Sequence, residues 1–179
     1  DPFKAPFGVP QPPESHLLFT GLKVGRQTIG GVPFEILDPQ GNDGRSFVVL
    51  HSPKAPTIRP WPHEAEIPVG EQGKRVFFLG NVHGWSSQDP GTGQWGAVAE
   101  YVIHYADGKT QTVPLITGRT IDEWAAGPEA DEVFLGPRGK TWHLNVIGAE
   151  LRPVQIEKIV FRDLDTPAAP VLVAVTLQK

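Results

Sequence analysis

The stretch from Gly96 to Ala106 alternates between two sets of side chains with a period of two residues, and this constrains the fold more than any other feature of the sequence. One face carries Ala97, Ala99, Tyr101, Ile103 and Tyr105, and the other carries Val98, Glu100, Val102 and His104. Such alternation is typical of a β-strand with one face in the core. The fold must therefore contain a sheet with a well-defined buried side.

The residues after this stretch predict an antiparallel hairpin. Asp107-Gly108 separates it from a second strand-like run, Lys109–Ile116. Asp-Gly between two alternating runs favours a two-residue turn with both residues at positive φ, which would place His104 opposite Gln111. Pro114 has no N–H for the ladder, so this second strand should lie at a sheet edge or contain a bulge.

Short apolar runs separated by Gly, Asn, Asp and Pro predict strands along most of the remaining chain. These runs are His16–Val24, Val32–Leu37, Phe47–His51, Ala65–Val69, Arg75–Val82, Thr141–Ile147, Val154–Phe161 and Val171–Leu177. A phase change near Glu157-Lys158 predicts a β-bulge. Val171–Leu177 is apolar on both faces up to Thr176, so we expect it to be a central strand.

One helical turn interrupts the strands. Thr120-Ile121-Asp122-Glu123 matches a capping box, and the turn should end at Gly127. About ten strands with a single helical turn, and no strand–helix alternation, predict an all-β fold. The expected architecture is an antiparallel two-sheet β-sandwich of the jelly-roll type.

Length and composition fit one domain. The chain has 179 residues, of which 39% are hydrophobic, enough for one core. Residues 1–15 contain five prolines and should form an extended arm or linker, leaving residues 16–179 as the sandwich domain. The net charge of -4 provides no basic surface, so we expect neither nucleic acid nor membrane as a partner.

The chain contains no cysteine, which excludes disulfides and thiolate metal ligands. It also contains no methionine and begins with Asp-Pro-Phe, as a mature or excised fragment would. The absence of cysteine does not by itself settle the compartment.

Several stretches in this order resemble galactose-binding-like β-sandwich domains, including carbohydrate-binding modules of secreted bacterial proteins. They are GVPFEILDP (31–39), IPVGEQGKRVFFLGNVHGW (67–85), GAVAEYVIHYADGKTQTVPLITG (96–118), IDEW (121–124) and IEKIVFRDLDTPAAPVLVAVTL (156–177). The resemblance covers about residues 16–178 and consists mainly of strands and turns. It implies the sandwich fold, binding of a polysaccharide or glycan, and a secreted or periplasmic protein with further domains in a larger chain.

The five tryptophans are the candidates for sugar contact, because an indole offers a flat apolar face and one N–H donor. Trp85 and Trp95 bracket a polar, glycine-rich segment and are accompanied by His83, Gln88, Asp89 and Gln94. Trp61 lies between prolines that could hold its ring in place. A core position is the alternative for each of the three, and Trp124 and Trp142 are expected in the core.

One metal hypothesis arises from the sequence. Asp38, Asn42 and Asp43 lie in a turn-rich acidic segment and could bind a structural Ca²⁺, which the resemblance also implies; an ordinary hairpin loop is the alternative. The six histidines show no HxH or HExxH spacing, so sequence spacing alone predicts no zinc or copper site.

Catalytic signatures are weak. Asp122 and Glu123 are adjacent, so their side chains should diverge, and the sequence contains no GxSxG elbow or phosphate-binding loop. We therefore expect a non-catalytic carbohydrate-binding module that uses exposed tryptophans. The alternatives are a polysaccharide hydrolase or lyase on the same scaffold, and a structural or adhesive module without a small ligand.

Overall fold

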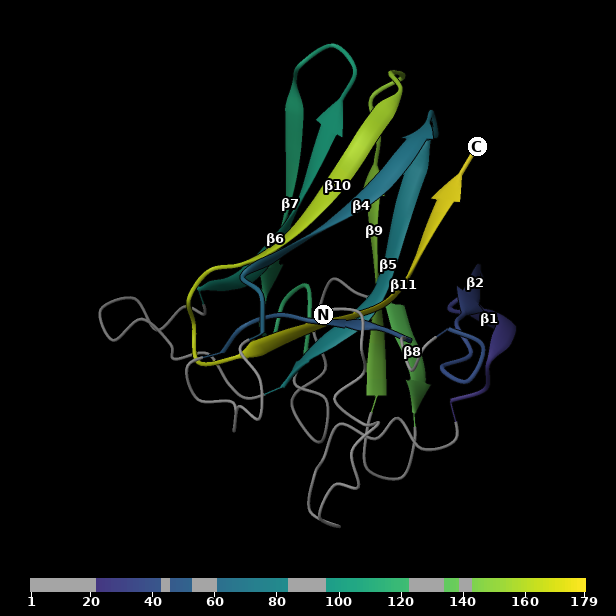
Figure 1. The fold of residues 1–179 in the computed structure, drawn as a ribbon, viewed down its shortest axis with the longest axis vertical. Coiled ribbons are helices and arrows are strands. Elements are labelled where there is room, and N and C mark those ends of the chain that lie inside the picture. The colour runs from purple at the N-terminus through teal and green to yellow at the C-terminus, as the bar shows by residue number, and fades with distance from the viewer. Residues whose placement is uncertain (1–21, 43–45, 53–60, 84–95, 123–133, 139–142) are drawn as a thin grey trace.

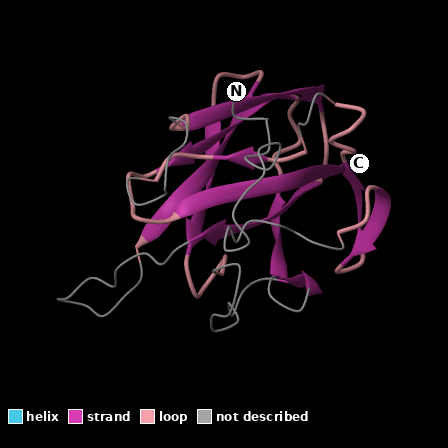
Figure 2. Cartoon of the chain, turned by 60° about the horizontal axis from the view of Figure 1, so that its bottom comes forward, coloured by secondary structure: helices cyan, strands magenta, loops and turns pink. Residues whose placement is uncertain are grey.

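A computed structural model describes residues 22–42, 46–52, 61–83, 96–122, 134–138 and 143–179, with only the backbone described for 134–138 (Figure 1). Every regular element in these ranges is a strand (Figure 2). The strands are β1 (Gly25–Ile29), β2 (Val32–Ile36), β3 (Val48–Val49), β4 (Glu64–Glu71), β5 (Arg75–His83), β6 (Ala97–Tyr105), β7 (Thr110–Ile116), β8 (Phe134–Arg138), β9 (His143–Glu150), β10 (Ile156–Asp163) and β11 (Ala169–Gln178). Within the described ranges, no helix is long and apolar enough to cross a membrane.

The strands form two antiparallel sheets packed as a β-sandwich, which confirms the predicted fold class. One sheet has the order β4-β10-β6-β7 and the other has the order β3-β11-β5-β9-β8. The hairpin β1-β2 packs on the outer face of the second sheet, where Phe34 joins a cluster with Phe77, Leu79 and Val171. The five-stranded sheet is therefore covered on both faces, which explains why the side chains of β11 are apolar on both faces of the strand.

An aromatic stack joins the two sheets through the middle of the core. Phe78 on β5 stacks on Tyr101 of β6 with ring centroids 3.7 Å apart, and Tyr101 contacts Phe161 of β10 at 4.8 Å. All three side chains are fully buried. Because Phe78 belongs to one sheet and its partners to the other, the stack sets how the sheets face each other.

The alternation predicted for Gly96–Ala106 is confirmed from Ala99 onward, because Ala99, Tyr101, Ile103 and Tyr105 all lie in the core between the sheets. It is wrong at the start of the strand, where the register shifts between Ala97 and Ala99 and Val98, rather than Ala97, belongs to the core. The predicted bulge in β10 is also present, as a register shift between Ile156 and Lys158.

The hairpin after β6 is present, but the predicted loop and register are wrong. Gly108 N–H donates to Tyr105 O at 2.9 Å, and Tyr105 N–H donates to Lys109 O at 3.0 Å. The loop therefore has three residues, 106–108, and only Gly108 has positive φ, at 77°. This is the turn-plus-bulge loop, in which a glycine in the left-handed region closes a β-turn.

The longer loop shifts the pairing by one residue. His104 lies opposite Thr110, Ile103 opposite Gln111, and Val102 opposite Thr112. Pro114 lies on β7, which is an edge strand as predicted.

The predicted helical turn is not supported in the part that can be described. The Thr120 hydroxyl accepts a hydrogen bond from Ile116 N–H at 2.7 Å and donates to Pro114 O at 3.0 Å. Both partners precede Thr120, whereas a helix N-cap bonds to backbone N–H groups that follow it. Ile121 forms an isolated bridge with Thr117. Residues 123–127 lie outside the described ranges.

The hairpin end of the sandwich is closed by polar contacts between the two sheets. Arg152 donates from its two terminal guanidinium nitrogens to Asp107, at 3.0 and 2.6 Å, and lies over the Tyr105 ring. The hydrogen bonds from Arg152 lower the pKa of the Asp107 carboxyl to about 2. The Tyr105 hydroxyl donates to Gln111 at 2.7 Å, and the Gln111 amide donates to Glu150 O at 2.8 Å.

We expect Gly108→Val to lower the free energy of unfolding by about 1–2 kcal/mol, because a β-branched residue resists positive φ. Gly96→Val is the matched control, since an added Cβ meets nothing within 4 Å at either position and only Gly108 has positive φ. Urea denaturation of both variants measures the difference. Equal losses would show that the backbone conformation at Gly108 is not the cause.

Tyr101→Phe should raise the free energy of unfolding by about 1 kcal/mol, because the Tyr101 hydroxyl is buried without a hydrogen-bond partner among the described residues. Burial also raises the pKa of this hydroxyl far above its ordinary value. Tyr105→Phe is the control and should be destabilising, because the Tyr105 hydroxyl has two partners. Thermal denaturation of the pair tests this, and a loss of stability in Tyr101→Phe would contradict it.

Candidate functional site

One end of the sandwich collects strand ends from both sheets, and we call it the loop end. Here β5 ends, β6 begins, β9 begins, β10 ends and β11 begins (Figure 1). The register confirms the grouping, because Ala169 pairs with His83 and Asp163 pairs with Ala99. His83 and Gly96, which flank the segment 84–95, both belong to this end.

Buried polar side chains are concentrated at the loop end. The described polar or charged residues that are buried are Ser52, Asn81, Thr117, Asp122, His143, Asn145 and Asp163. Each lies at or close to a strand end on this side: for example, Asn81 Nδ2 donates to His143 O at 2.7 Å, and Val82 N–H donates to Asp122 O at 3.1 Å. Burying polar groups costs stability unless they are paired, so a sandwich built only for packing has no reason to place them together.

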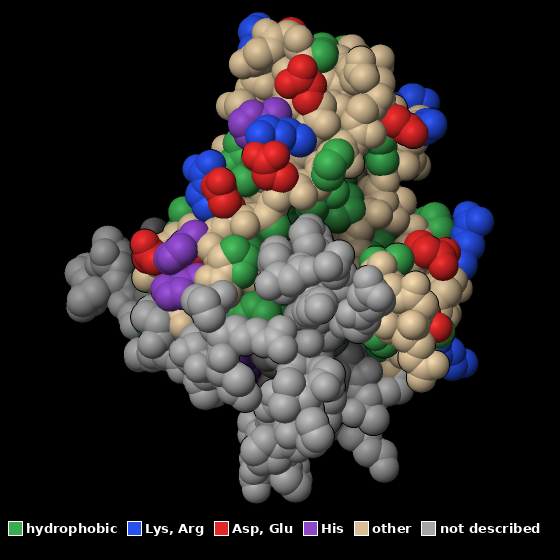
Figure 3. Space-filling model, viewed as in Figure 1, with side chains coloured by type: hydrophobic (Ala, Val, Ile, Leu, Met, Phe, Trp, Pro, Cys, Tyr) green, Lys and Arg blue, Asp and Glu red, His purple; other side chains and the backbone are tan. Residues whose placement is uncertain are grey.

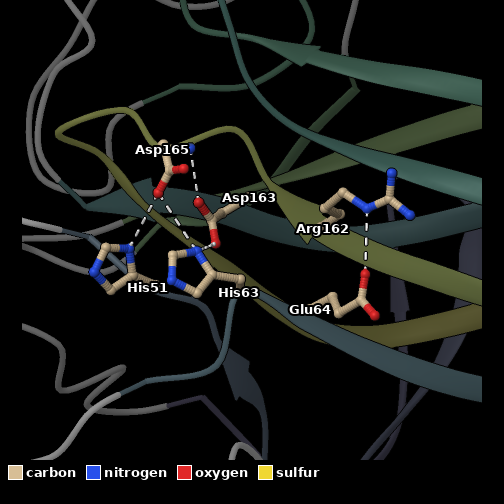
Figure 4. A network of polar contacts seen from close by, with 6 residues as sticks. All are labelled: His51, His63, Glu64, Arg162, Asp163 and Asp165. Atoms are coloured by element: carbon tan, nitrogen blue, oxygen red, sulfur yellow. Dashed lines mark hydrogen bonds and ion pairs between the residues drawn. The ribbon is translucent and has the colours of Figure 1, made fainter.

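A compact polar cluster at the loop end joins His51, His63, Asp163 and Asp165 (Figure 4). Antiparallel pairing of β4 with β10 brings His63 beside Asp163, whose N–H donates to His63 O at 2.9 Å. His51 N–H donates to Pro62 O at 2.9 Å, which holds the residues after β3 against those before β4. Backbone pairing alone thus assembles four side chains from three segments.

The ligand-type atoms of these four side chains converge. One nitrogen or oxygen from each lies within 4.8 Å of the others. His63 Nδ1 is 2.9 Å from Asp163 Oδ2 and 3.4 Å from Asp165 Oδ1, while His51 Nδ1 is 3.7 Å from Asp165 Oδ1. The two imidazole rings lie against each other with centroids 4.2 Å apart. Both Nδ1 atoms face the carboxylates (Figure 4).

The two aspartates are positioned by a tight turn at the end of β10. Asp163 Oδ1 accepts a hydrogen bond from Asp165 N–H at 2.7 Å, and Asp165 adopts a φ of 56°. The Asp163 side chain is 1% exposed, whereas that of Asp165 is 78% exposed. The cluster therefore has a buried floor and an open side, and Figure 3 shows histidine and acidic side chains adjoining on this surface.

Among the described residues, the nearest arginine on β10 adds no free positive charge to the cluster. Arg162 on β10 pairs with Glu64 at 3.3 Å and with Glu100 at 3.5 Å, directed away from the cluster (Figure 4). Its positive charge is therefore already compensated, and within the described ranges the carboxylates of Asp163 and Asp165 are the main charges of the cluster.

Of the predicted sugar-binding residues, only His83 and Trp61 lie in the described ranges. His83 is half-buried at the end of β5. Trp61 is half-buried and packs in part against the apolar cluster on the outer face of the five-stranded sheet. The remaining predicted residues, Trp85, Gln88, Asp89, Gln94 and Trp95, fall outside those ranges, as do Trp124 and Trp142.

Two of the predicted calcium ligands, Asp38 and Asn42, lie after β2 in the described ranges. Asp38 is exposed, and its Oδ1 accepts a hydrogen bond from Gln40 N–H at 2.9 Å. Asn42 lines a mainly apolar surface groove of about 300 Å³ between β2, β3 and β11. Asp43 lies outside the described ranges, so calcium binding by this set stays a prediction.

Sequence reasoning missed the four-residue cluster. His51 and His63 have no metal-type spacing, and Asp163-Leu164-Asp165 is separated from them by about one hundred residues. The available signal was the position of these residues in the sequence: His63 lies two residues before the predicted strand Ala65–Val69, and the two aspartates follow the predicted strand Val154–Phe161. Using it would have required knowing that these two strands pair.

Comparisons with known proteins returned no match: no protein-family model, no curated protein and no solved structure is significantly similar to this chain.

Proposed function

We propose that this domain is a non-catalytic module that binds a polysaccharide or other glycan at the loop end of its sandwich. The observation that carries the proposal is the concentration of buried polar side chains at that end. Proteins place costly polar groups where ligands are recognised, and loops displayed on a rigid sandwich are a common location for binding sites.

The chemistry of the loop end suits a sugar. The segment 84–95 begins after His83 and carries two tryptophans with Gln88, Asp89 and Gln94. Apolar indole faces stack on the C–H faces of pyranose rings, and amide and carboxylate groups can bond to hydroxyls. Trp61, which is half-buried just before β4, provides an indole at the loop end among the described residues.

A module of this kind would act outside the cytoplasm, in a secreted or periplasmic bacterial protein that carries other domains. The opposing hypotheses are a polysaccharide hydrolase or lyase, and an adhesive module that binds no sugar. An array of plant, algal and microbial polysaccharides, followed by assay of reducing-end release on each glycan that binds, separates the three. Binding without release supports the proposal, release supports an enzyme, and no binding supports the adhesive module.

We expect Trp95→Ala to weaken binding of the best array glycan by about tenfold or more. Loss of one stacked indole removes about 1.5–3 kcal/mol of apolar contact, and 1.4 kcal/mol corresponds to a factor of ten. Calorimetry measures the dissociation constant, and thermal denaturation serves as the folding control, since Trp95 should not contribute to the core. An unchanged dissociation constant would move the site, with Trp61→Ala as the next variant.

A further inference from the structure

We propose that His51, His63, Asp163 and Asp165 bind one zinc ion. This inference is independent of glycan binding, because it depends only on the four side chains described above (Figure 4). Their ligand-type atoms include two imidazole nitrogens and two carboxylate oxygens, and all of them lie within 4.8 Å of one another.

The spacing of these atoms matches a tetrahedral site. Zinc holds nitrogen and oxygen ligands at about 2.0–2.1 Å, which places neighbouring ligands about 3.3–3.4 Å apart in a tetrahedron. Three of the nitrogen–oxygen separations are 2.9, 3.4 and 3.7 Å, and all separations in the cluster are at most 4.8 Å. The widest would have to close by about 1.4 Å for the four atoms to surround a common centre.

Simple ion pairing explains the cluster less well. His63 Nδ1 faces two carboxylate oxygens, but a ring nitrogen carries at most one proton and can direct it at only one of them. Although Asp163 Oδ2 is 2.9 Å from His63 Nδ1, it has no hydrogen-bond partner among the described residues, and neither has His51 Nδ1.

The burial of Asp163 is the second, independent observation. Its side chain is 1% exposed, and Oδ2 is aimed into the cluster without a hydrogen bond from any residue that the structure describes. A buried carboxylate oxygen without a donor is strongly unfavourable. A cation between the four side chains would compensate Asp163 Oδ2 and His51 Nδ1 at the same time.

The chemistry of the four ligands, two imidazoles and two carboxylates, favours zinc over calcium or magnesium. Imidazole nitrogen suits zinc and other late first-row metals, whereas calcium and magnesium prefer sites made only of oxygen. Two carboxylates also balance the charge of a divalent ion bound by two neutral imidazoles. Four protein ligands fill a tetrahedral shell, which is typical of a structural zinc site rather than a catalytic one.

Zinc in this position would brace the loop end. His51 follows β3, His63 precedes β4, and both aspartates lie at or just after the end of β10. One ion would therefore tie the two ends of the connection 50–63 to a strand of the four-stranded sheet. Because the unfolded chain has no such site, binding should also stabilise the fold.

The test uses the full chain without a histidine tag, stripped with a chelator and then dialysed. Calorimetric titration with zinc should give one ion per chain. His63→Gln should weaken zinc binding at least tenfold, and its side chain is exposed enough for the fold to tolerate the change. His104→Gln is the matched control, because His104 is half-buried on β6, far along the strand from the cluster, and should bind zinc as the wild type does.

Two further measurements keep the proposal falsifiable if a variant folds poorly. Cobalt substituted for zinc in the wild-type chain should show the intense visible bands of a tetrahedral site, and zinc should raise the melting temperature of the wild type but not of Asp165→Asn. The absence of stoichiometric zinc binding in the wild type would overturn the proposal. So would equal zinc affinity in His63→Gln and the wild type, or displacement of zinc by equimolar calcium.

Discussion

The stack of Phe78, Tyr101 and Phe161 is the contact on which the rest of the structure depends. It is the point at which the five-stranded sheet, through β5, meets two neighbouring strands of the four-stranded sheet. Large aromatic side chains dominate the energetics of a core, and stacked pairs contribute beyond their buried area. Because the rings fix how the sheets face each other, they also fix which strand ends come together at the two ends of the sandwich.

The two ends differ in chemistry. At the hairpin end, Arg152 pairs with Asp107, and Tyr105 and Gln111 satisfy nearby polar groups, so the polar contacts there lie mainly near the surface. At the loop end, polar groups are buried and several strands stop together. The described part of the chain therefore has one end that closes the fold and another whose composition costs stability. We propose that these buried polar groups are retained, despite their cost in stability, because the loop end binds a ligand.

Local pattern predicted the strands well because alternation and apolar runs are local properties. For example, β6 spans Ala97–Tyr105 where the pattern predicted Gly96–Ala106, and β11 spans Ala169–Gln178 where it predicted Val171–Leu177. The hairpin register was wrong because Asp107-Gly108 is compatible with either a two-residue turn or a three-residue turn-plus-bulge, and the two differ by one residue in pairing. The sequence pattern missed the first strand, Gly25–Ile29, because Ile29 is its only large apolar residue and the strand therefore shows no apolar alternation.

The cluster at the loop end could not be predicted for a different reason. Its side chains come from residues about one hundred positions apart, and they meet only through the pairing of β4 with β10. No spacing rule within one segment encodes that contact. The tryptophan hypothesis depends on composition within a single segment, so it could be formed from the sequence, although most of its residues fall outside the described ranges.

The central claim is that the loop end is the functional surface of this sandwich. It is tested most directly by mapping amide chemical shifts on the ¹⁵N-labelled chain during titration with the glycan that binds best on the array. The account predicts the largest changes at His83, Gly96 and Trp61, with little change at Asp107 or Arg152. Changes centred on the hairpin end, or on the groove lined by Asn42, would contradict it.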